Sequence, residues 1–531
     1  MKRKVRYRAQ NGMQEKEIVY IPVRYTVAMV LTVLELAVIL ASAIALCFVL
    51  PYFYIVAILI HLGCVIKIAA SDDNPDYKIP WLLVILFLPV IGFMLYFLFY
   101  SRKLKRKYRK RLSYLADHSY EKPDDGALLA ALGAEDRLVA SHAAMLCDIA
   151  DTHIFAGTEV RYFPLGERAH RAMLEDLCRA RRFIFLEYFI IEEGKCWSPI
   201  LAILREKAAA GVDVRVVYDD VGCMKTLPGN YDRILRGFGI SAVSFARLRG
   251  QADGEINNRS HRKIMVIDGE VGYTGGMNLA DEYINETVRF GHWKDVAIRL
   301  EGAAVSELTH LFLIDYGISV KRMPEITTEL FPVACGEEAM PAALPSAEKG
   351  YVIPFGDGPR PIYRNQVGKL VIQNLLAGAT RYVYMMTPYL IIDNDLCQSM
   401  ENAALRGVDV RILLPHIPDK RIIFNISRTF YKRLVDVGVR IYEYTPGFLH
   451  AKVYLADDAC AMVGTVNLDY RSLVHHFENG VWLYRTPCLA DIRRDIEGTL
   501  ALCEEVDPAS IKATPLARFF RSIVRILSPL L

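Results

Sequence analysis

Two short stretches of this sequence carry the same reactive side chains at the same spacing. Each holds a histidine, a lysine two residues later, an aspartate seven residues later and an asparagine seventeen residues later. The two sets are His261, Lys263, Asp268 and Asn278, and His450, Lys452, Asp457 and Asn467. A lone histidine is usually a satisfied core residue, but a repeated set with matched spacing indicates a duplicated catalytic unit.

These side chains suit displacement at a phosphate ester. A lysine ammonium and an asparagine amide donate to non-bridging oxygens, and so stabilise the charge of a five-coordinate phosphorus transition state. Histidine titrates near neutral pH, so it serves as nucleophile, acid or base without a metal. We therefore expect one histidine to attack phosphorus and form a covalent phosphohistidine. The other protonates the departing alcohol and then takes the proton from the incoming one.

Carboxylates near the two motifs have separate expected roles. Both stretches alternate like β-strands, so Asp268 and Asp457 point to the face opposite the histidine and lysine. For these two aspartates we favour a structural salt bridge or turn role over direct catalysis. An imidazole also needs a carboxylate to orient it. Asp295 and Glu478, which follow the two motifs by 34 and 28 residues, are the candidates.

The composition restricts the class of protein. At 531 residues the chain is long enough for two or more domains. Its net charge of +4 is near neutral, which argues against a general nucleic-acid-binding surface. The 11 cysteines include no Cys-x-x-Cys pair and no His-rich partner cluster, so we expect reduced thiols used as small apolar residues, and neither a disulfide framework nor a zinc site.

Residues 1–111 are typical of a membrane anchor. Two or three apolar runs, at about 26–49, 52–70 and 79–100, match the roughly 20 residues that one crossing needs. The basic segment 102–111 predicts that everything after it is cytoplasmic. The basic N-terminus predicts a cytoplasmic location for itself as well, which three full crossings cannot satisfy. Either one of the first two runs is re-entrant, or the N-terminal charges, the weaker signal, do not determine the orientation. Glu35, inside the first run, is either a polar contact to a helix or headgroup or a neutralised residue with no special role.

The rest of the chain predicts a duplicated α/β region. Residues 112–150 form a helical connector, 151–320 and 351–507 are two similar halves, and 321–350 are a linker rich in Pro, Ala and Glu. Each half has a buried strand, at 182–191 and 381–389, followed by a helix and by Gly-Val-Asp-Val-Arg, at 211–215 and 407–411. Residues 508–531 form a basic amphipathic helix, for which attachment to anionic lipid and docking onto the protein are equally compatible.

Together these motifs resemble the phospholipase D superfamily, and in particular the membrane-anchored bacterial cardiolipin synthases. The resemblance rests on Asn-Arg-Ser-His-Arg-Lys at 258–263, Gly-Gly-Met-Asn at 275–278, Thr-Pro-Tyr at 387–389, Pro-Asp-Lys at 418–420, Gly-Phe-Leu-His-Ala-Lys at 447–452 and Asn-Leu-Asp-Tyr-Arg-Ser at 467–472. It implies two α/β halves, each a mixed sheet flanked by helices, with pseudo-twofold symmetry and the site at their interface. Tyr316, where many relatives carry Trp, and His476, where many carry Asn, are departures expected to lie away from the motif residues.

The resemblance also implies a reaction in which two phosphatidylglycerol molecules give cardiolipin and glycerol. The catalytic set carried over by position is His261, Lys263, Asp268, His450, Lys452 and Asp457. Within it His261 is the expected nucleophile and His450 the acid and base. The remaining roles are phosphate binding by Lys263, Lys452, Asn278 and Asn467, and orientation of the histidines by Asp295 and Glu478.

The implied partners are phosphatidylglycerol, other anionic phospholipids and the bilayer of a bacterial inner or plasma membrane. The resemblance implies a multi-pass anchor, a cytoplasmic catalytic part, and no cofactor, metal or nucleic acid. The sequence carries no feature that indicates an oligomeric state.

Three other functions share parts of this pattern. A hydrolytic phospholipase D, or a transferase that uses another alcohol or phosphatidylethanolamine, has the same motif letters, because acceptor choice depends on pocket shape. A nuclease of the same superfamily would need a basic groove, which the near-neutral charge and the apolar runs disfavour. A membrane scaffold with a dead site is disfavoured because both motifs are complete.

Overall fold

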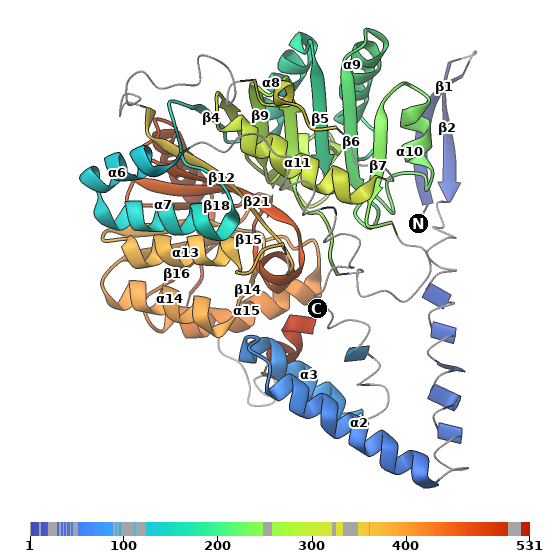
Figure 1. The fold of residues 1–531 in the computed structure, drawn as a ribbon, viewed down its shortest axis with the longest axis vertical. Helices are drawn as coiled ribbons and strands as arrows, with labels where there is room; N and C mark the ends of the chain where they lie inside the picture. Colours follow the sequence, from blue (N-terminus) through green and yellow to red (C-terminus); the bar gives the residue numbers. More distant parts are fainter. Residues whose placement is uncertain are drawn as a thin grey trace.

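Two mixed β-sheets form the centre of the protein (Figure 1). The computed structural model describes residues 2–9, 12–19, 51–88, 124–247, 257–320, 325–332, 349–360, 362–507 and 522–530, and a few isolated positions elsewhere. In spatial order, the first sheet comprises β4 (Glu159–Phe163), β11 (Ala297–Glu301), β9 (Val271–Gly275), β8 (Lys263–Ile267), β5 (Phe183–Tyr188), β6 (Asp213–Asp219) and β7 (Ser241–Phe245). The second comprises β22 (Cys503–Glu505), β16 (Arg440–Tyr444), β15 (Asp409–Pro415), β13 (Tyr382–Met386), β18 (Val453–Ala456), β19 (Cys460–Gly464), β21 (Glu478–Tyr484), β12 (Tyr351–Asp357) and β3 (Phe155–Ala156).

The second sheet repeats the order and direction of the first. Strands β5, β6 and β7 run parallel, and so do β13, β15 and β16. The remaining neighbours of the seven-strand unit are antiparallel in both sheets. The prediction of a duplicated α/β fold is therefore confirmed for the described residues, and the second sheet is longer by the edge strands β22 and β3.

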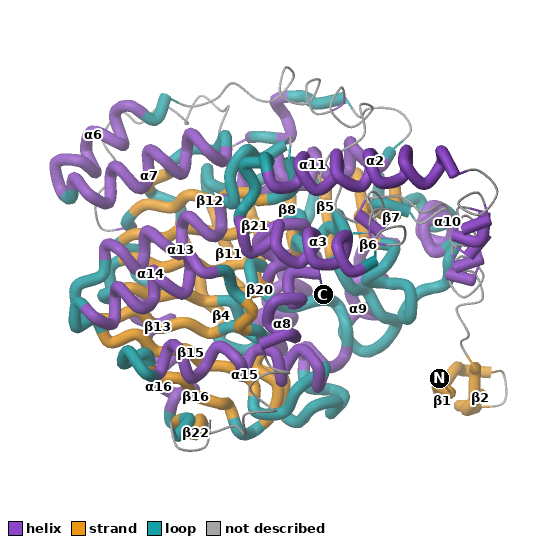
Figure 2. The backbone as a smooth tube through the Cα atoms, turned by 90° about the horizontal axis from the view of Figure 1, so that it is seen from below, coloured by secondary structure: helices purple, strands orange, loops and turns teal. Residues whose placement is uncertain are grey.

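Helices separate the sheets from each other and from solvent (Figures 1 and 2). The outer face of the first sheet packs against α8 (Gly166–Arg179), α9 (Trp197–Ala209) and α10 (Tyr231–Arg236). The layer between the sheets contains α11 (Val305–Ser319) and α16 (Leu489–Leu500), whose apolar side chains share one core with both sheets. The outer layer of the second sheet contains α6 (Gly126–Glu135), α7 (Arg137–Ala150), α13 (Val367–Gly378), α14 (Asn394–Leu405) and α15 (Arg421–Val435).

The repeated Gly-Val-Asp-Val-Arg sequence has the same structure in both halves. Gly211 follows α9 with φ 90° and Gly407 follows α14 with φ 89°, a conformation that a residue with a Cβ atom rarely adopts. The strands that follow, β6 and β15, alternate between half-buried and buried side chains over their first residues. Gly211 and Gly407 thus follow the ends of equivalent helices.

A helix pair precedes the two halves. It comprises α2 (Pro51–Ala69), which coincides with the second predicted run, and α3 (Pro75–Phe87). Helix α3 begins at Pro75, ahead of the apolar run that starts at residue 79, because the Asn74 side chain caps the helix by accepting from the Asp76 N–H and Pro75 suits the first turn. Within the described part of the chain, no helix combines the length and apolar character that a membrane crossing requires. Most of the first run, including Glu35, and most of the linker 321–350 lie outside the described residues.

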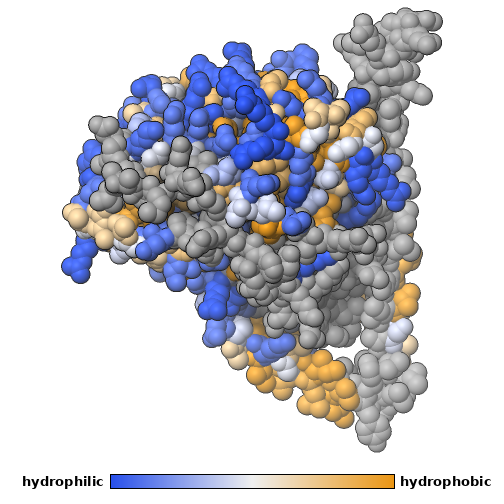
Figure 3. Space-filling model, turned by 45° about the horizontal axis from the view of Figure 1, so that its top comes forward, coloured by the Kyte–Doolittle hydropathy of each residue, from blue (hydrophilic) through white to orange (hydrophobic). Residues whose placement is uncertain are grey.

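Apolar side chains cover the outer surface of this helix pair. Figure 3 shows hydrophobic surface at the lower end of the molecule, the end from which α2 and α3 project in Figure 1. The exposed side chains are Ile55, Val56, Ile58, Leu59, Ile60, Leu62 and Ile66 of α2, and Ile79, Leu86 and Phe87 of α3. Contiguous apolar surface of this kind marks a site of contact with lipid or with another protein.

Both ends of the chain carry a short described segment. At the N-terminus β1 (Lys2–Ala9) and β2 (Gly12–Val19) form an antiparallel hairpin. At the C-terminus η8 (Ser528–Leu530) contacts α3, and the Arg525 guanidinium lies 4.5 Å from the centre of the Phe430 ring. The described end of the C-terminal helix therefore docks onto the protein, while Ile523 and Ile526 stay exposed.

Candidate active site

The two histidine motifs occupy equivalent places in the two sheets. His261 and Lys263 lie at the start of β8, and His450 and Lys452 directly precede β18. Strands β8 and β18 themselves are fully buried, and their residues alternate between the core that lies between the sheets and the outer core of their own half. Each reactive pair therefore projects from the beginning of a rigid central strand.

Beside the histidines, short extended segments of the two halves pair with each other. Strand β10 (His292–Lys294) of the first half pairs in parallel with β17 (Gly447–Leu449) of the second, and an isolated bridge joins Ser260 to Phe477. The backbone N–H of His450 donates to Lys294 O at 2.8 Å, and that of His261 donates to Phe477 O at 2.8 Å. The residues that come next, Asp295 and Glu478, are thereby placed behind the histidine of the opposite half.

Each histidine is oriented by a fully buried carboxylate. Nδ1 of His261 lies 3.0 Å from both carboxylate oxygens of Glu478, and Nδ1 of His450 lies 2.6 Å from Oδ2 of Asp295. An ionised carboxylate only accepts hydrogen bonds, so when Glu478 and Asp295 are ionised the proton of each ring is on Nδ1. Lys452 Nζ also lies 2.9 Å from Nδ1 of His450. Nε2 of each imidazole is then left to react with a substrate.

The two motif sets share one electrostatic environment. Burial, with positive charge from Lys263 and Lys452, holds the pKa of both histidines well below its usual value. Burial also lowers the pKa of Lys263 to about 7 and that of Lys452 to about 8. Since each lysine acts on both imidazoles, the four side chains converge on one site.

The pKa values of the two carboxylates, Asp295 and Glu478, are shifted upward, whereas those of the histidines and lysines are shifted downward. Burial raises the pKa of Asp295 to about 6 and that of Glu478 to about 7. Glu478 also accepts from Ser472 Oγ at 2.6 Å and from Thr465 Oγ1, whereas Asp295 accepts from the Val296 backbone N–H at 2.8 Å. The Glu478 carboxylate is thus held by two hydroxyl groups as well as by His261.

Both motif asparagines are buried. The Asn278 side chain accepts from the Ile190 N–H at 3.0 Å and donates to Tyr283 Oη at 2.8 Å. The backbone N–H of Asn467 donates to Ser472 Oγ at 2.8 Å, and its Oδ1 has no hydrogen-bond partner among the described residues. Phosphate binding by the two asparagines stays a prediction.

The motif aspartates lie at the opposite ends of their strands from the histidines. Asp268 accepts from the backbone N–H groups of residues 181, 182 and 183 at 2.7–2.9 Å. Asp457 binds those of residues 380, 381 and 382 at 2.7–2.9 Å. Both adopt positive φ, 55° and 54°. The resemblance places both aspartates in the catalytic set. In the structure, however, each one binds the backbone of a neighbouring turn, and we propose no chemical step for either.

Aromatic rings around the histidines were missed from the sequence. The Phe189 ring packs edge-on to His261 with 5.0 Å between centroids. Tyr283, Trp293 and Phe448 surround His450 at 5.5, 5.6 and 5.8 Å. A signal existed for two of them: Trp293 precedes Asp295 by two residues and Phe448 precedes His450 by two, which puts each pair on one face of an extended chain.

The two departures from the resembled family lie in different surroundings. Tyr316 belongs to α11 and stacks on Phe312 with 5.7 Å between ring centroids, away from the motifs as expected. His476 was also expected to lie away from them, and that is wrong. Its Nδ1 lies 3.8 Å from Glu478 Oε1 and its ring centroid 5.5 Å from that of His261, because the Ser260–Phe477 bridge brings the segment alongside.

Among the described residues, one set of side chains has donor atoms close enough to share a metal ion. One donor atom each from His261, His476 and Glu478 lies within 4.8 Å of the other two. A nitrogen and oxygen set of this kind fits Zn²⁺. Lys263 and Lys452 contribute positive charge at the same place, which favours an anion over a cation.

Comparisons with known proteins match both halves of the chain. The family "Cardiolipin synthase, PLD-like domain" matches residues 173–289 and 372–500, and "Phospholipase_D-nuclease N-terminal" matches 53–99. An uncharacterized protein of Streptococcus mutans is 38% identical over 88% of this chain and 100% of its own length. Cardiolipin synthase 2 of Bacillus cereus is 35% identical over 88% of this chain and 89% of its own length.

A phosphatidylserine synthase of Haemophilus influenzae shares the fold, with a TM-score of 0.56 at 14% identity over 74% of this chain and 100% of that one. At that identity the likeness concerns the fold alone. The sequence matches, which span most of the chain and both motifs, are the stronger finding. The chain therefore belongs to the cardiolipin synthase family of the phospholipase D superfamily.

Proposed function

We propose that this protein is a cardiolipin synthase that transfers a phosphatidyl group from one phosphatidylglycerol to another and releases glycerol. The observation that carries the proposal is the pair of crossed contacts, His261 with Glu478 and His450 with Asp295. Two imidazoles with the same tautomer, facing one basic site, suit a double displacement at phosphorus.

In the first displacement Nε2 of His261 attacks the phosphorus of one phosphatidylglycerol. A phosphorus–nitrogen bond forms while the bond from phosphorus to the headgroup glycerol oxygen breaks. His450, as imidazolium, gives its Nε2 proton to that oxygen, and glycerol leaves. The negative phosphate favours the protonated form of His450, which offsets the lowering of its pKa by burial and by the two lysines.

In the second displacement the roles of the bonds are reversed. A headgroup hydroxyl of another phosphatidylglycerol gives its proton to His450, and its oxygen attacks phosphorus. The phosphorus–nitrogen bond to His261 breaks, and cardiolipin leaves. Lys263 and Lys452, with the amides of Asn278 and Asn467, hold the non-bridging oxygens in both steps, so the charge of the transition state meets fixed donors.

We place the protein in a bacterial cell membrane, with the catalytic halves on the cytoplasmic side. The exposed apolar surface of α2 and α3 and the match of residues 53–99 to an N-terminal family region support the membrane location. The basic segment 102–111 supports the sidedness. Cys178 is exposed on the first half, so a membrane-impermeant maleimide should label it only after the cells are opened. Labelling of intact spheroplasts would contradict the sidedness.

Product analysis tests the reaction. Purified full-length protein in detergent, given phosphatidylglycerol, is expected to form cardiolipin and glycerol in equal amounts. Phosphatidic acid in place of cardiolipin would identify a hydrolase, and a different phospholipid from mixed lipids plus alcohols would identify another acceptor. The His261→Ala variant is the matched control for contaminating activity.

A further inference from the structure

The first turn of α3 touches the catalytic half at a buried polar contact. Oη of Tyr77 lies 3.3 Å from Nε2 of His475, and the two ring centroids are 5.6 Å apart. Tyr77 is 2% exposed and His475 6% exposed. The contact joins residues 398 positions apart in the sequence, so it depends on how the helix pair docks.

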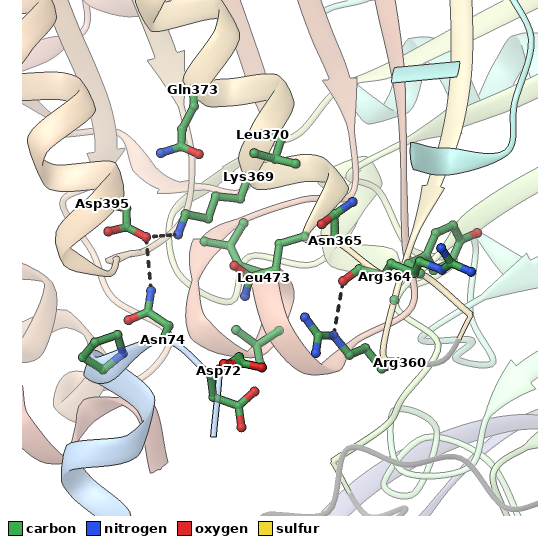
Figure 4. A pocket seen from close by; sticks show the side chains of 16 residues that line it. Asp72, Asn74, Arg360, Arg364, Asn365, Lys369, Leu370, Gln373, Asp395 and Leu473 are labelled. Atoms are coloured by element: carbon green, nitrogen blue, oxygen red, sulfur yellow. Dashed lines mark hydrogen bonds and ion pairs between the residues drawn. The ribbon is translucent and has the colours of Figure 1, made fainter. Parts of the chain in front are cut away.

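Hydrogen bonds fix this docking on the second half. Nδ2 of Asn74 donates to Asp393 Oδ2 at 2.9 Å and to Asp395 Oδ2 at 3.3 Å, and Asp76 Oδ2 accepts from the Asn394 N–H at 2.5 Å. Lys369 of α13 pairs with the same two aspartates of the second half. Figure 4 shows Asn74, Asp395 and Lys369 meeting at the wall of a cavity of about 410 Å³. The helix pair, whose outer surface is apolar, is thus attached to the second half through hydrogen bonds between residues 74–76 and 393–395, which we call the seat.

The same cavity is lined by the turn that carries His475. His475 ends the π-helical turn η6 (Arg471–His475), and residues 473 and 474 of that turn line the cavity. A single π-helical turn is an uncommon conformation that occurs at functional sites, and its shape depends on the contacts around it. Tyr77 supplies one of those contacts from outside the catalytic half.

The other end of this turn reaches the catalytic histidine. Ser472 Oγ donates to Glu478 Oε1 at 2.6 Å, and Glu478 in turn accepts from Nδ1 of His261 at 3.0 Å. The path of contacts therefore runs from Tyr77 to His475, through one turn of backbone to Ser472, and by Glu478 to His261. Tyr77 comes from α3, Glu478 from β21 and His261 from the residues before β8, so the turn that carries both His475 and Ser472 is the link between them.

We propose that Tyr77 is a positioning residue for His261, and that the docking of the α2–α3 helix pair on the second half aligns the nucleophile. When the helix pair is seated, the turn 471–475 holds the Ser472 hydroxyl on Glu478. When the contact is lost, the turn relaxes, Glu478 loses a donor and His261 loses part of its orientation. The docking of the apolar helix pair then controls the alignment of His261, in addition to attaching the helices to the second half. The catalytic part of this inference rests on the proposed function, in which His261 attacks phosphorus.

A double-mutant cycle tests the coupling, because spatial continuity alone does not demonstrate it. The full-length variants are Tyr77→Phe, Ser472→Ala and the combination, assayed with phosphatidylglycerol in mixed micelles. Tyr77→Phe is expected to lower kcat by about tenfold, the size of one coupled hydrogen bond, with KM for the lipid unchanged. The double variant is expected to be no slower than Ser472→Ala. Losses that multiply, or a loss confined to KM, would show a simple anchor and overturn the proposal.

The matched control is Ser71→Ala. Its hydroxyl donates to Ile68 O inside the helix pair at 2.9 Å and belongs to neither the seat nor the catalytic path. This variant is expected to keep the wild-type kcat and KM. Equal losses in Ser71→Ala and Tyr77→Phe would mean that any damage to the helix pair lowers activity.

Amide hydrogen exchange gives a readout that needs no turnover. Peptides covering residues 471–478 are expected to exchange faster in Tyr77→Phe than in wild type, and at the wild-type rate in Ser71→Ala. Unchanged exchange over 471–478 in Tyr77→Phe would overturn the proposal whatever reaction the protein performs. If exchange rises while the wild type makes no cardiolipin, the positioning of the turn stands and the proposed function fails.

Discussion

Asp295 accepts a hydrogen bond from Nδ1 of His450 at 2.6 Å, although the two residues come from different halves of the chain. Replacing Asp295 with Asn removes the charge that stabilises the imidazolium and frees the ring to change tautomer. We expect kcat to fall by roughly 10²–10⁴-fold, the range for loss of oriented acid–base catalysis. Glu478→Gln, the matched change behind His261, is expected to cost a similar factor. Near-normal rates of glycerol release from either folded variant would contradict this role for the crossed contacts.

The division of labour between the histidines predicts different trapped states. With a phosphatidyl ester of p-nitrophenol, whose leaving group needs no proton, His450→Ala should still form the adduct on His261. That adduct should then accumulate, because no base activates the incoming alcohol. Mass spectrometry of the peptide containing residue 261 measures it, and His261→Ala is the control that should carry no label. An adduct on His450 in the His261 variant would reverse the assignment.

The perturbed pKa values predict a maximum of kcat/KM near neutral pH. Above it, Lys263 and Lys452 lose their protons, since burial lowers their pKa values to about 7 and about 8, and phosphate binding weakens. Below it, Asp295 and Glu478 gain protons around pH 6 and pH 7 and no longer stabilise an imidazolium. Lys452→Arg keeps its charge at high pH, so whatever activity it retains should persist further into the alkaline range. A flat profile from pH 5 to pH 9 would rule out titration of these groups.

Asp268 is expected to matter for stability rather than for chemistry. Asp268→Ala leaves three backbone N–H groups without an acceptor and places alanine at a φ of 55°. We expect a loss of about 1–3 kcal/mol in the free energy of unfolding, measured by denaturation in detergent. The folded fraction should keep most of its kcat. Asp457→Ala, at a more exposed turn, is the comparison and should cost less.

Chelators are expected to leave the activity unchanged. The proposed displacements use imidazole, ammonium and amide groups, and no step calls for a Lewis acid. The measurement is glycerol release after dialysis against EDTA, with metal content checked by mass spectrometry. Loss of activity that Zn²⁺ restores would instead assign a cation to the set formed by His261, His476 and Glu478.

The sequence predicted what depends on local pattern. Matched spacing identified both motifs, and the strand-like pattern after His261 predicted β8, with Asp268 directly after its last residue. The partner of each carboxylate could not be read in this way. Asp295 and Glu478 were found as candidates, but only the pairing of β10 with β17 and of Ser260 with Phe477 decides which histidine each one meets.

Contacts between residues far apart in the sequence could not be predicted from local patterns for the same reason. Nothing near Tyr77 indicates that its partner is His475, and nothing in a Ser-Leu-Val-His segment indicates a π-helical turn. The helix propensity around residues 75–87 was visible as an apolar run, but the start of α3 depends on the Asn74 side chain. Such details arise from tertiary docking, which one-dimensional patterns do not encode.

The crossed strands also determine how this protein can be recombined with its relatives. A chimera that joins the first half of one synthase to the second half of another separates every histidine from the carboxylate it evolved with. His261 would then meet a foreign Glu478 equivalent, and His450 a foreign Asp295 equivalent. The inherited units of function are thus the two crossed pairs, each drawn from both repeats, and not the repeats themselves. Productive exchange between family members would move short segments around residues 258–263 and 476–478 together, leaving the rest of each half in place.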